Sequence, residues 1–350
     1  MGYTPHYYTR KKVTGWEDSS QITLSTQLIL EAATELGVAW KVFPGTKIFE
    51  LSYEGEKKYF RYQISTETTD IGFYACEDKS VTNNLLAAAG INVANGYNIL
   101  TEDPPEYWEA VFQALSKPLV VKPTHGNQGD AISLGITTLK QFQEAVKKAF
   151  ALTNQKDAGV LVEETCKGQE YRILLTREKV LGIAYRRPAN VVGDGSSTIQ
   201  QLIDVKNQDP RRDPNSTISP FKKIKVDEDM TANLKEQGLT AESVPAAGQR
   251  IFLRKVSNIS KGGQSIDFTD QAHPSVKEIA LKAVQAIPGL DFAGLDFMTP
   301  DITKDQAETG YTIIEVNSSP GFCIQELPDE GEPRNAQYEF VKLAFPSLRK

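Results

Sequence analysis

Cysteine and histidine are scarce in this sequence, with three residues of each among 350. The cysteines, Cys76, Cys166 and Cys323, lie far apart and form no CxxC pair. The sequence therefore predicts neither a disulfide framework nor a zinc ribbon. A histidine metal site is not expected either, because such a site draws on several histidines.

Long apolar runs and an excess of basic charge are also missing. No segment approaches the length of a membrane span, and the first 20 residues contain no apolar core of a signal peptide. The formal net charge is −6 and the pI is near 5.4, which argues against a nucleic-acid partner held by bulk charge. We therefore expect a cytoplasmic protein that has neither a membrane nor a nucleic-acid partner.

The sequence does contain alternating helical and extended patterns, which are typical of mixed α+β architecture. Its length is enough for two or three compact domains. Helical spacing is found in residues 27–43, where a strand follows, and in residues 78–90, 139–153 and 273–287. Strand patterns are found in residues 117–123, 159–165, 169–192, 293–298 and 311–317, the third of these as a hairpin. Residues 205–265 are polar and only weakly periodic, so we expect functional loops there.

The segment YTIIEVN, residues 311–317, is an apolar strand that carries two oxygen-bearing side chains, Glu315 and Asn317. Residues two apart on a strand project from the same face, so these two side chains point together. Asp296 interrupts a second apolar strand, and pairing of the two strands would bring all three side chains together. Such oxygen donors suit Mg²⁺. The alternative is an ordinary solvent-facing edge strand.

The segment VVKPTHGNQGDAISLG, residues 120–135, is a second candidate. Gly126 and Gly129 would let backbone N–H groups approach an anion, and Lys122 would add a point charge for a phosphate. The spacing matches neither a Walker A loop nor a dinucleotide fingerprint. An ordinary hairpin is the alternative, with His125 as an exposed turn residue instead of a catalytic one.

Two further segments carry polar side chains next to apolar runs. In residues 159–175, a strand ends at Glu163 and Glu164, and Glu170 and Arg172 follow two apart, so carboxylates there could read an adenine amino group and ribose hydroxyls. The alternative is a solvated charged hairpin. In residues 250–270, Arg254 follows an apolar run and is expected to point inward, while Lys261-Gly262-Gly263 could form a backbone nest for an anion. Scattered surface cations would look similar.

The order of these features resembles the ATP-grasp carboxylate–amine ligases, and in particular D-alanine–D-alanine ligase. The amino-acid sequences of the motifs are similar to those in the ATP-grasp modules of cyanophycin synthetase and of the bifunctional glutamate–cysteine ligase/glutathione synthetase. The resemblance spans about residues 75–335, and the first 75 residues match only loosely. The motifs that carry it are VVKPTHGNQGDAI, YRRPANVVGDGSSTIQQLID with NQDPRR, FLRKVSNISKGGQSIDFTDQAHP, AGLDF and IIEVNSSPGF.

The resemblance implies an α+β (mixed α/β) ATP-grasp fold in which ATP is held between two α+β subdomains. The implied division is an N-terminal pre-ATP domain (1–78), an ATP-grasp lid subdomain (79–165) and a C-terminal ATP-grasp subdomain with the metal and substrate site (166–350). The glycine loop at 124–131 is the candidate lid.

The resemblance also assigns site residues. The implied cofactor-binding residues are Lys79, Lys122, Gly126, Gly129, Glu163, Glu164, Cys166 and Glu170. The implied ligands of two Mg²⁺ ions, with Mn²⁺ able to substitute, are Asp296, Glu315 and Asn317. The implied catalytic residues are Arg254 and Lys261, and the candidates for holding a substrate carboxylate are Arg172, Arg187 and Arg334.

The implied activity is ATP-dependent ligation, in which a carboxylate of an amino acid or peptide is activated as an acylphosphate and coupled to an amine. The alternatives are an ATP-grasp phosphotransferase and a degenerate nucleotide-binding regulatory protein. The tail PGFCIQELPDEGEPR lacks the basic residues typical of cyanophycin synthetase, so cyanophycin is not the expected product. We expect a stand-alone homodimeric ligase, since the additional modules of both resembling enzymes are missing.

Overall fold

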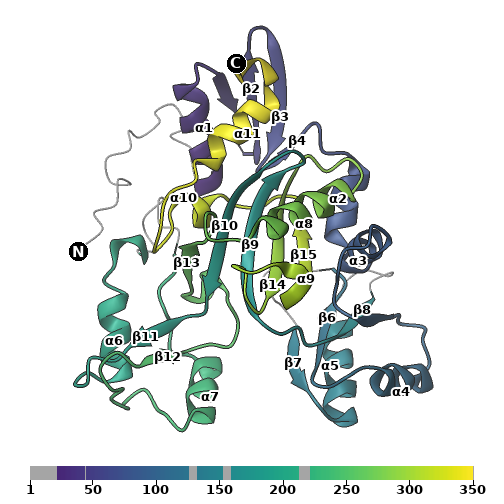
Figure 1. Cartoon of the computed structure of the whole chain (residues 1–350), viewed down its shortest axis with the longest axis vertical. Helices are drawn as coiled ribbons and strands as arrows, with labels where there is room; N and C mark the ends of the chain where they lie inside the picture. Colours follow the sequence, from purple (N-terminus) through teal and green to yellow (C-terminus); the bar gives the residue numbers. More distant parts are fainter. Residues whose placement is uncertain (1–21, 44, 126–131, 153–158, 213–220, 350) are drawn as a thin grey trace. The chain divides into compact units, whose positions relative to one another are not determined.

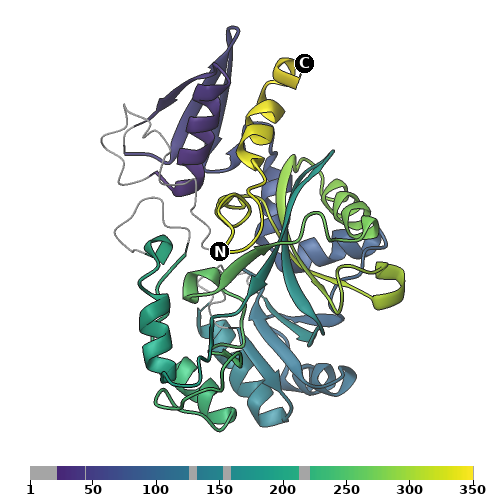
Figure 2. The ribbon, with the colours of Figure 1, turned by 60° about the vertical axis from the view of Figure 1, so that its left-hand side comes forward.

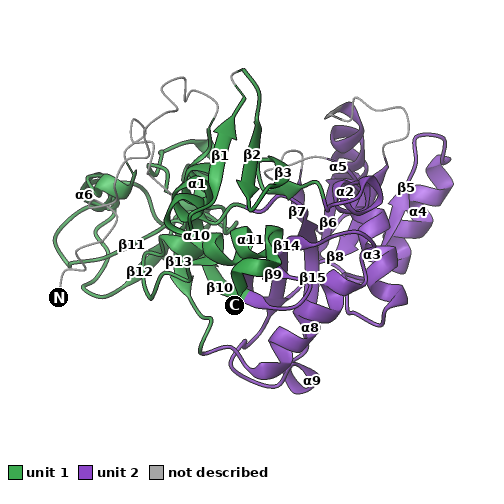
Figure 3. Cartoon of the chain, turned by 90° about the horizontal axis from the view of Figure 1, so that it is seen from above, with its two compact units in different colours: residues 1–66, 181–270, 321–350 green, residues 67–180, 271–320 purple. Residues whose placement is uncertain are grey.

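A computed structural model of the chain describes residues 22–43, 45–125, 132–152, 159–212 and 221–349 (Figure 1). The chain divides into two compact units, each assembled from separate stretches of sequence (Figure 3). Unit 1 contains Met1–Thr66, Leu181–Asp270 and Gly321–Lys350, and unit 2 contains Glu67–Val180 and Gln271–Pro320. The sheets are antiparallel and mixed with helices, which confirms the expected α+β class. The boundaries expected near residues 78 and 165 stay predictions.

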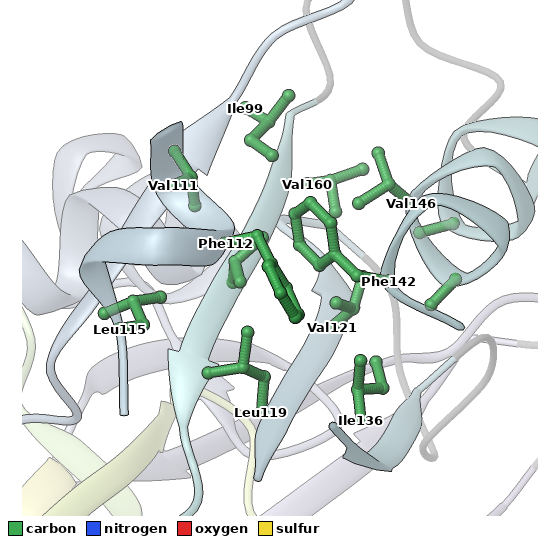
Figure 4. Close-up of a cluster of buried hydrophobic side chains, with 13 residues drawn as sticks. Ile99, Val111, Phe112, Leu115, Leu119, Val121, Ile136, Phe142, Val146 and Val160 are labelled. Atoms are coloured by element: carbon green, nitrogen blue, oxygen red, sulfur yellow. The ribbon is translucent and has the colours of Figure 1, made fainter. Parts of the chain in front are cut away.

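The first sheet of unit 2 has four antiparallel strands in the order β5-β8-β6-β7. These are β5 (Gly96–Ile99), β6 (Leu119–Pro123), β7 (Ser133–Ile136) and β8 (Val160–Glu164), with helices α4 (Pro105–Ala114) and α5 (Leu139–Leu152) between them in sequence. Alternate residues of the central strands, such as Val121 and Val162, enter a core in which Phe112 and Phe142 lie 5.3 Å apart between ring centroids (Figure 4). The other face of β6 and β8 therefore carries the intervening residues, Lys122 and Glu163 among them.

A second group of strands in unit 2 is built on β14, which pairs antiparallel with β9 on one side and β15 on the other. These strands are β9 (Gln169–Thr176), β14 (Phe292–Thr299) and β15 (Thr312–Asn317). Helix α8 (Pro274–Gln285) contacts β9 and β14, while α2 (Asp70–Glu77) and α3 (Lys79–Ala88) contact β15 (Figure 1). A short helix, α9 (Gln306–Thr309), precedes β15. The predicted helices at 78–90, 139–153 and 273–287 are confirmed.

Unit 1 contains a four-stranded antiparallel sheet, in the order β1-β2-β3-β4, with helix α1 (Leu24–Glu35) lying along it (Figure 2). The strands are β1 (Ala39–Val42), β2 (Ile48–Tyr53), β3 (Glu56–Arg61) and β4 (Ile64–Ser65), so the helix and strand expected in residues 27–43 are confirmed. Helix α11 (Ala336–Ala344) contacts α1, and the Phe340 ring lies 5.4 Å from that of Phe60. The final turn is η5 (Pro346–Arg349).

Residues 205–265 of unit 1 differ from the expectation of irregular functional loops. Residues 205–265 are not a stretch of irregular loops, because they contribute to a separate small core with helix α7 (Glu228–Glu236) at its edge. Met230 and Leu234 lie one helical turn apart and are buried, and the Asp227 side chain caps the helix by accepting the Met230 N–H. The other elements are β10 (Val180–Arg187), β11 (Asn190–Val192), α6 (Ile199–Lys206), η3 (Pro210–Arg212), β12 (Arg250–Phe252), η4 (Ile259–Lys261), β13 (Gln264–Asp267) and α10 (Cys323–Glu326). Strand β10 pairs with β13, and β11 pairs with β12.

None of the helices in the described part of the chain has the length and apolarity needed to cross a membrane.

Candidate active site

One face of the β9-β14-β15 group carries five of the polar residues singled out in the sequence. The register places Asp296 of β14 opposite Glu315 of β15 and opposite Arg172 of β9. Directly opposed residues, and residues two apart on one strand, share a face. Asn317 and Glu170 therefore lie on the same face as these three. The expected pairing of the Asp296 and Glu315 strands is confirmed.

Cations neutralise both carboxylates at the centre of this face. Arg172 Nε lies 2.5 Å from Asp296 Oδ1, and its Nη2 lies 3.2 Å from Oδ2. Lys79 Nζ lies 3.6 Å from Glu315 Oε1. Lys79 is the first residue of α3, which Asp78 caps by accepting the Ser80 and Val81 N–H groups. The α3 start thus delivers an ammonium group to the same sheet face.

The donor set on this face fits a magnesium ion. Asp296 and Glu315 offer carboxylate oxygens, and Asn317 offers an amide oxygen. The Asn317 Nδ2 donates to the Gly294 carbonyl oxygen at 3.5 Å. Within the described ranges, no three His, Cys, Asp or Glu side chains form a metal-binding group. A cation here would therefore use two carboxylates and an amide, which suits Mg²⁺ because phosphate or water usually completes its octahedral shell.

A second charged pair lies on the β5-β8-β6-β7 sheet, on the face away from its core. Lys122 Nζ lies 2.6 Å from Glu163 Oε2, and both residues are only 4% exposed. Asn83 of α3 donates from Nδ2 to Glu163 Oε1 at 3.0 Å. The Lys79 N–H donates to the Thr124 carbonyl oxygen at 3.1 Å, just after β6. Helix α3 therefore contacts both charged groups of unit 2.

Asn83 is a site residue that sequence reasoning missed. It lies four residues after Lys79 and therefore on the same face of α3. That spacing was a usable signal, but only the tertiary fold shows that this face meets Glu163.

Two other predicted residues, Glu164 and Cys166, lie at the end of β8 and just after it. Glu164 Oε1 accepts the Ser116 N–H at 2.9 Å and the Asn95 Nδ2 at 3.1 Å, and the bond from Ser116 lowers the pKa of the Glu164 carboxyl. Cys166 is half-buried, and this burial raises the pKa of its thiol. Both residues therefore lie near the Lys122–Glu163 pair. The Glu164 carboxylate already accepts hydrogen bonds from Ser116 and Asn95.

The glycines of the proposed lid, Gly126 and Gly129, lie outside the described residues. His125 precedes them and is half-buried instead of fully exposed. Its Nδ1 lies 3.0 Å from Thr124 Oγ1, and its Nε2 lies 3.8 Å from Asp78 Oδ2.

The predicted catalytic residues belong to unit 1. Arg254 is buried, as expected, and its Nη2 donates to Asp227 Oδ2 at 2.5 Å and to the Lys225 carbonyl oxygen at 3.2 Å. Asp227 thus caps α7 and also holds the guanidinium. The interpretation of residues 261–263 as an anion nest is wrong, because all three backbone N–H groups donate to the carbonyl oxygens of Asn258 and Ile259. The tight η4 turn uses these donors, so the catalytic prediction for Lys261 depends on its side chain.

The two remaining arginine candidates of unit 1 face carboxylates of the chain. Arg187 Nη1 lies 2.8 Å from Glu330 Oε1. Arg334 donates to both oxygens of Asp267 and lies 2.8 Å from Asp270 Oδ2, and the bond to Asp267 raises its pKa. A substrate carboxylate would have to share these guanidinium groups with the chain.

The fold and these side chains define a mixed α+β protein in which lysines, carboxylates and an amide gather on the sheet faces of one unit. Residues 85–237 match the family model described as the D-ala D-ala ligase C-terminus. The chain is 36% identical over 335 residues to the glutathione biosynthesis bifunctional protein GshAB of Clostridium perfringens, covering 95% of this chain and 42% of that protein. It is 34% identical over 329 residues to the cyanophycin synthetase of Geminocystis herdmanii, covering 94% of this chain and 37% of that protein.

A solved structure agrees with these relationships. The bifunctional glutathione synthetase from Pasteurella multocida superposes with a TM-score of 0.71 at 32% identity, covering 93% of this chain and 44% of that one. These similarities support the resemblance to the ATP-grasp ligases that the motifs indicated. It spans less than half the length of the curated relatives that it matches. The similarity covers 95% of the chain, so it extends well into the first 75 residues, which resembled the family only loosely.

Proposed function

We propose that the chain is an ATP-dependent ligase that activates a carboxylate of an amino acid or peptide as an acylphosphate and couples it to an amine, releasing ADP and phosphate. The observation that carries this proposal is the sheet face on which Arg172, Asp296 and Glu315 lie side by side, with Lys79 reaching it from α3. Similarity to the D-ala D-ala ligase C-terminus model and to the bifunctional protein GshAB supports it independently.

The charges on this face match the needs of the reaction. A carboxylate and a triphosphate repel each other, so they meet only where cations offset that repulsion. In the proposed site Lys79 and Lys122 contact the phosphates, Glu163 and Glu170 hold adenine and ribose, and Arg254 stabilises the transferring phosphoryl group. When bound, Mg²⁺ would supply positive charge that offsets the negative charge of the phosphates. Its proposed ligands are Asp296, Glu315 and Asn317.

The ion pairs of the chain hold the proposed site residues in place before substrates bind. Arg172 holds the Asp296 carboxylate in place through two hydrogen bonds. Lys122 is held by a buried carboxylate, which in turn is fixed by Asn83. Side chains preorganised in this way lose little freedom when a charged ligand arrives.

The remaining assignments are part of the same proposal. They comprise the roles of Gly126, Gly129, Glu164, Cys166 and Lys261, the substrate roles of Arg172, Arg187 and Arg334, two metal ions with Mn²⁺ as a substitute, a homodimer, a cytoplasmic location and the division at residues 78 and 165. We favour amino acids and small peptides as substrates because the reaction requires one carboxylate and one amine.

An assay of ADP and phosphate release with pairs of amino acids and dipeptides, followed by mass spectrometry of the products, tests the proposal. We expect net product only when a carboxylate and an amine are both present. A stable phosphorylated product that forms without an amine would establish a phosphotransferase instead. Nucleotide binding without turnover on any pair would establish a regulatory protein.

A further inference from the structure

Lys206 of unit 1 is a half-buried lysine with no carboxylate partner among the described residues. It ends helix α6, which lies beside β11 (Figure 1), and its Nζ donates to the Asn190 carbonyl oxygen at 2.7 Å. That bond uses one of its three donor positions. A lysine held in this way usually needs a counter-charge, because burial penalises its charged form.

Two arginines near Lys206 also form no ion pair within the part of the chain that the structure describes. Arg250 is exposed and donates from Nη1 to the Asn190 side-chain oxygen, so Asn190 joins it to Lys206. Arg212 is buried, and its partners among the described residues are the backbone carbonyl oxygens of Lys222, Gly262 and Gly263. Three cations therefore gather in one region around carbonyl and amide oxygens.

The electrostatics of the region are unbalanced. Burial, followed by the positive charges of Arg212, Arg250 and Arg187, lowers the pKa of Lys206 from 10.5 to about 8. Within the described ranges, Asp329 is the carboxylate that acts in the opposite direction, and its Oδ1 lies 3.5 Å from Arg211 Nη2. Arg187 already pairs with Glu330. An anion that entered beside Lys206 would relieve this repulsion, which is how many anion-binding sites are built.

We propose that Lys206 and Arg250, bridged by Asn190, form an anion-binding site that takes a carboxylate group of the small molecule on which the chain acts. Lys206 has two further donors and Arg250 has four, enough for a charge-assisted contact to both carboxylate oxygens. The identity of the ligand as a substrate rests on the proposed function, whereas anion binding itself does not. A phosphate group would present similar oxygens, so the experiment separates the two.

The first test measures binding of succinate and of inorganic phosphate to the full chain, without nucleotide or divalent metal, by isothermal titration calorimetry. The variant is Lys206→Met, and the matched control is Lys235→Met, which removes the same charge from an exposed position of α7 in the same unit. We expect Lys206→Met to weaken succinate binding by about tenfold or more, the usual loss for a charge-assisted hydrogen bond. The control should stay within about twofold.

Several outcomes would overturn the proposal. No succinate binding, equal weakening in both variants, or binding of phosphate alone would each reject a carboxylate site at Lys206. Lower thermal stability of Lys206→Met with unchanged succinate binding would make the lysine purely structural.

A second measurement uses the reactivity of the lysine itself. A lysine with a pKa near 8 is about half neutral at that pH, so acetic anhydride should label Lys206 faster than Lys235. Bound succinate favours the charged form and should slow labelling of Lys206 only. Binding should also weaken as the pH rises through about 8, because Lys206 then loses its proton. Labelling that succinate does not slow would count against the site.

Turnover separates this proposal from the proposed ligase activity. If substrate pairs are found, Lys206→Met should raise the KM for one of them with a smaller effect on kcat. An unchanged KM would show that the anion site is not a substrate site. If no pair supports turnover while succinate binding still depends on Lys206, the anion site stands and the ligase proposal fails.

Discussion

Lys122 and Glu163 form a buried ion pair in unit 2, with Nζ 2.6 Å from Oε2 and neither residue more than 4% exposed. Burying two charges costs free energy that their attraction offsets only while both partners are present. The third member, Asn83, donates to the other carboxylate oxygen and completes the arrangement. The same ion pair therefore contributes to the stability of unit 2 and to the proposed nucleotide site.

Removal of either partner should therefore be strongly destabilising. We expect Lys122→Met and Glu163→Gln each to lower the free energy of unfolding by about 3 kcal/mol, because each leaves a buried group without its partner. The double variant should lose clearly less than the sum of the two losses, since it removes both unpaired groups. Urea denaturation of the three variants measures this coupling, and strictly additive losses would contradict it.

Replacement of Glu315 should remove activity without unfolding the protein. Glu315→Gln keeps the shape of the side chain but loses the charge that faces Lys79 and, in the proposed site, the metal. We expect ADP formation to fall by roughly two orders of magnitude or more. The control is Glu308→Gln, an exposed position in helix α9 of the same unit. Near-normal turnover of Glu315→Gln, or an equal loss in the control, would count against the proposed metal site.

Gly168, in the connection between β8 and β9, tests how tightly this turn is packed. Its φ is +126°, and an added Cβ would lie 2.3 Å from the Thr299 carbonyl carbon and oxygen. Gly310 also has a positive φ, of +76°, but open space around it. Gly310→Ala should therefore cost about 1 kcal/mol of backbone strain, and Gly168→Ala about 3 kcal/mol, because a steric clash is added. Similar unfolding midpoints for the two variants would show that the Thr299 backbone yields easily.

The Asp194 carboxylate organises the turn before helix α6, and its contribution should depend on pH. It accepts hydrogen bonds from the hydroxyl and N–H groups of Ser197 and Ser196, and the bond from the Ser197 side chain contributes most to lowering its pKa. A lowered pKa means that stability is gained above the ordinary carboxyl pKa of 3.8 and is lost as the pH falls below it.

Asp194→Ala should therefore unfold at a lower temperature than the wild type at pH 7. This difference should shrink as the pH is lowered through the acid range. Glu242→Ala, an exposed position in the same unit, should show no such trend. A difference between Asp194→Ala and the wild type that stays constant down to pH 2 would contradict the linkage.

Local patterns in the sequence were sufficient to predict the main helices and strands and the family resemblance. Helices at 78–90, 139–153 and 273–287 were predicted from apolar spacing, which depends on neighbours along the chain. The shared face of Glu315 and Asn317 follows from the two-residue repeat of a strand alone. Helix α7 was missed because its short apolar stripe, Met230 and Leu234, is surrounded by polar residues.

The partners of the site residues were decided by the tertiary structure. Arg172 meets Asp296 across 124 residues of sequence, and Asn83 meets Glu163 across 80, because sheet register and helix docking bring them together. The folded chain likewise determines that the N–H groups of residues 261–263 are used within their own turn, and that Lys206 and Arg250 both bond to Asn190. The sequence by itself determined which residues carry charge and which face of a strand or helix they share. Which charges neutralise one another, and which are available to a ligand as we propose for Lys206, depends on the folded chain. The reason is that electrostatic energies depend on distance and burial and not on order along the chain.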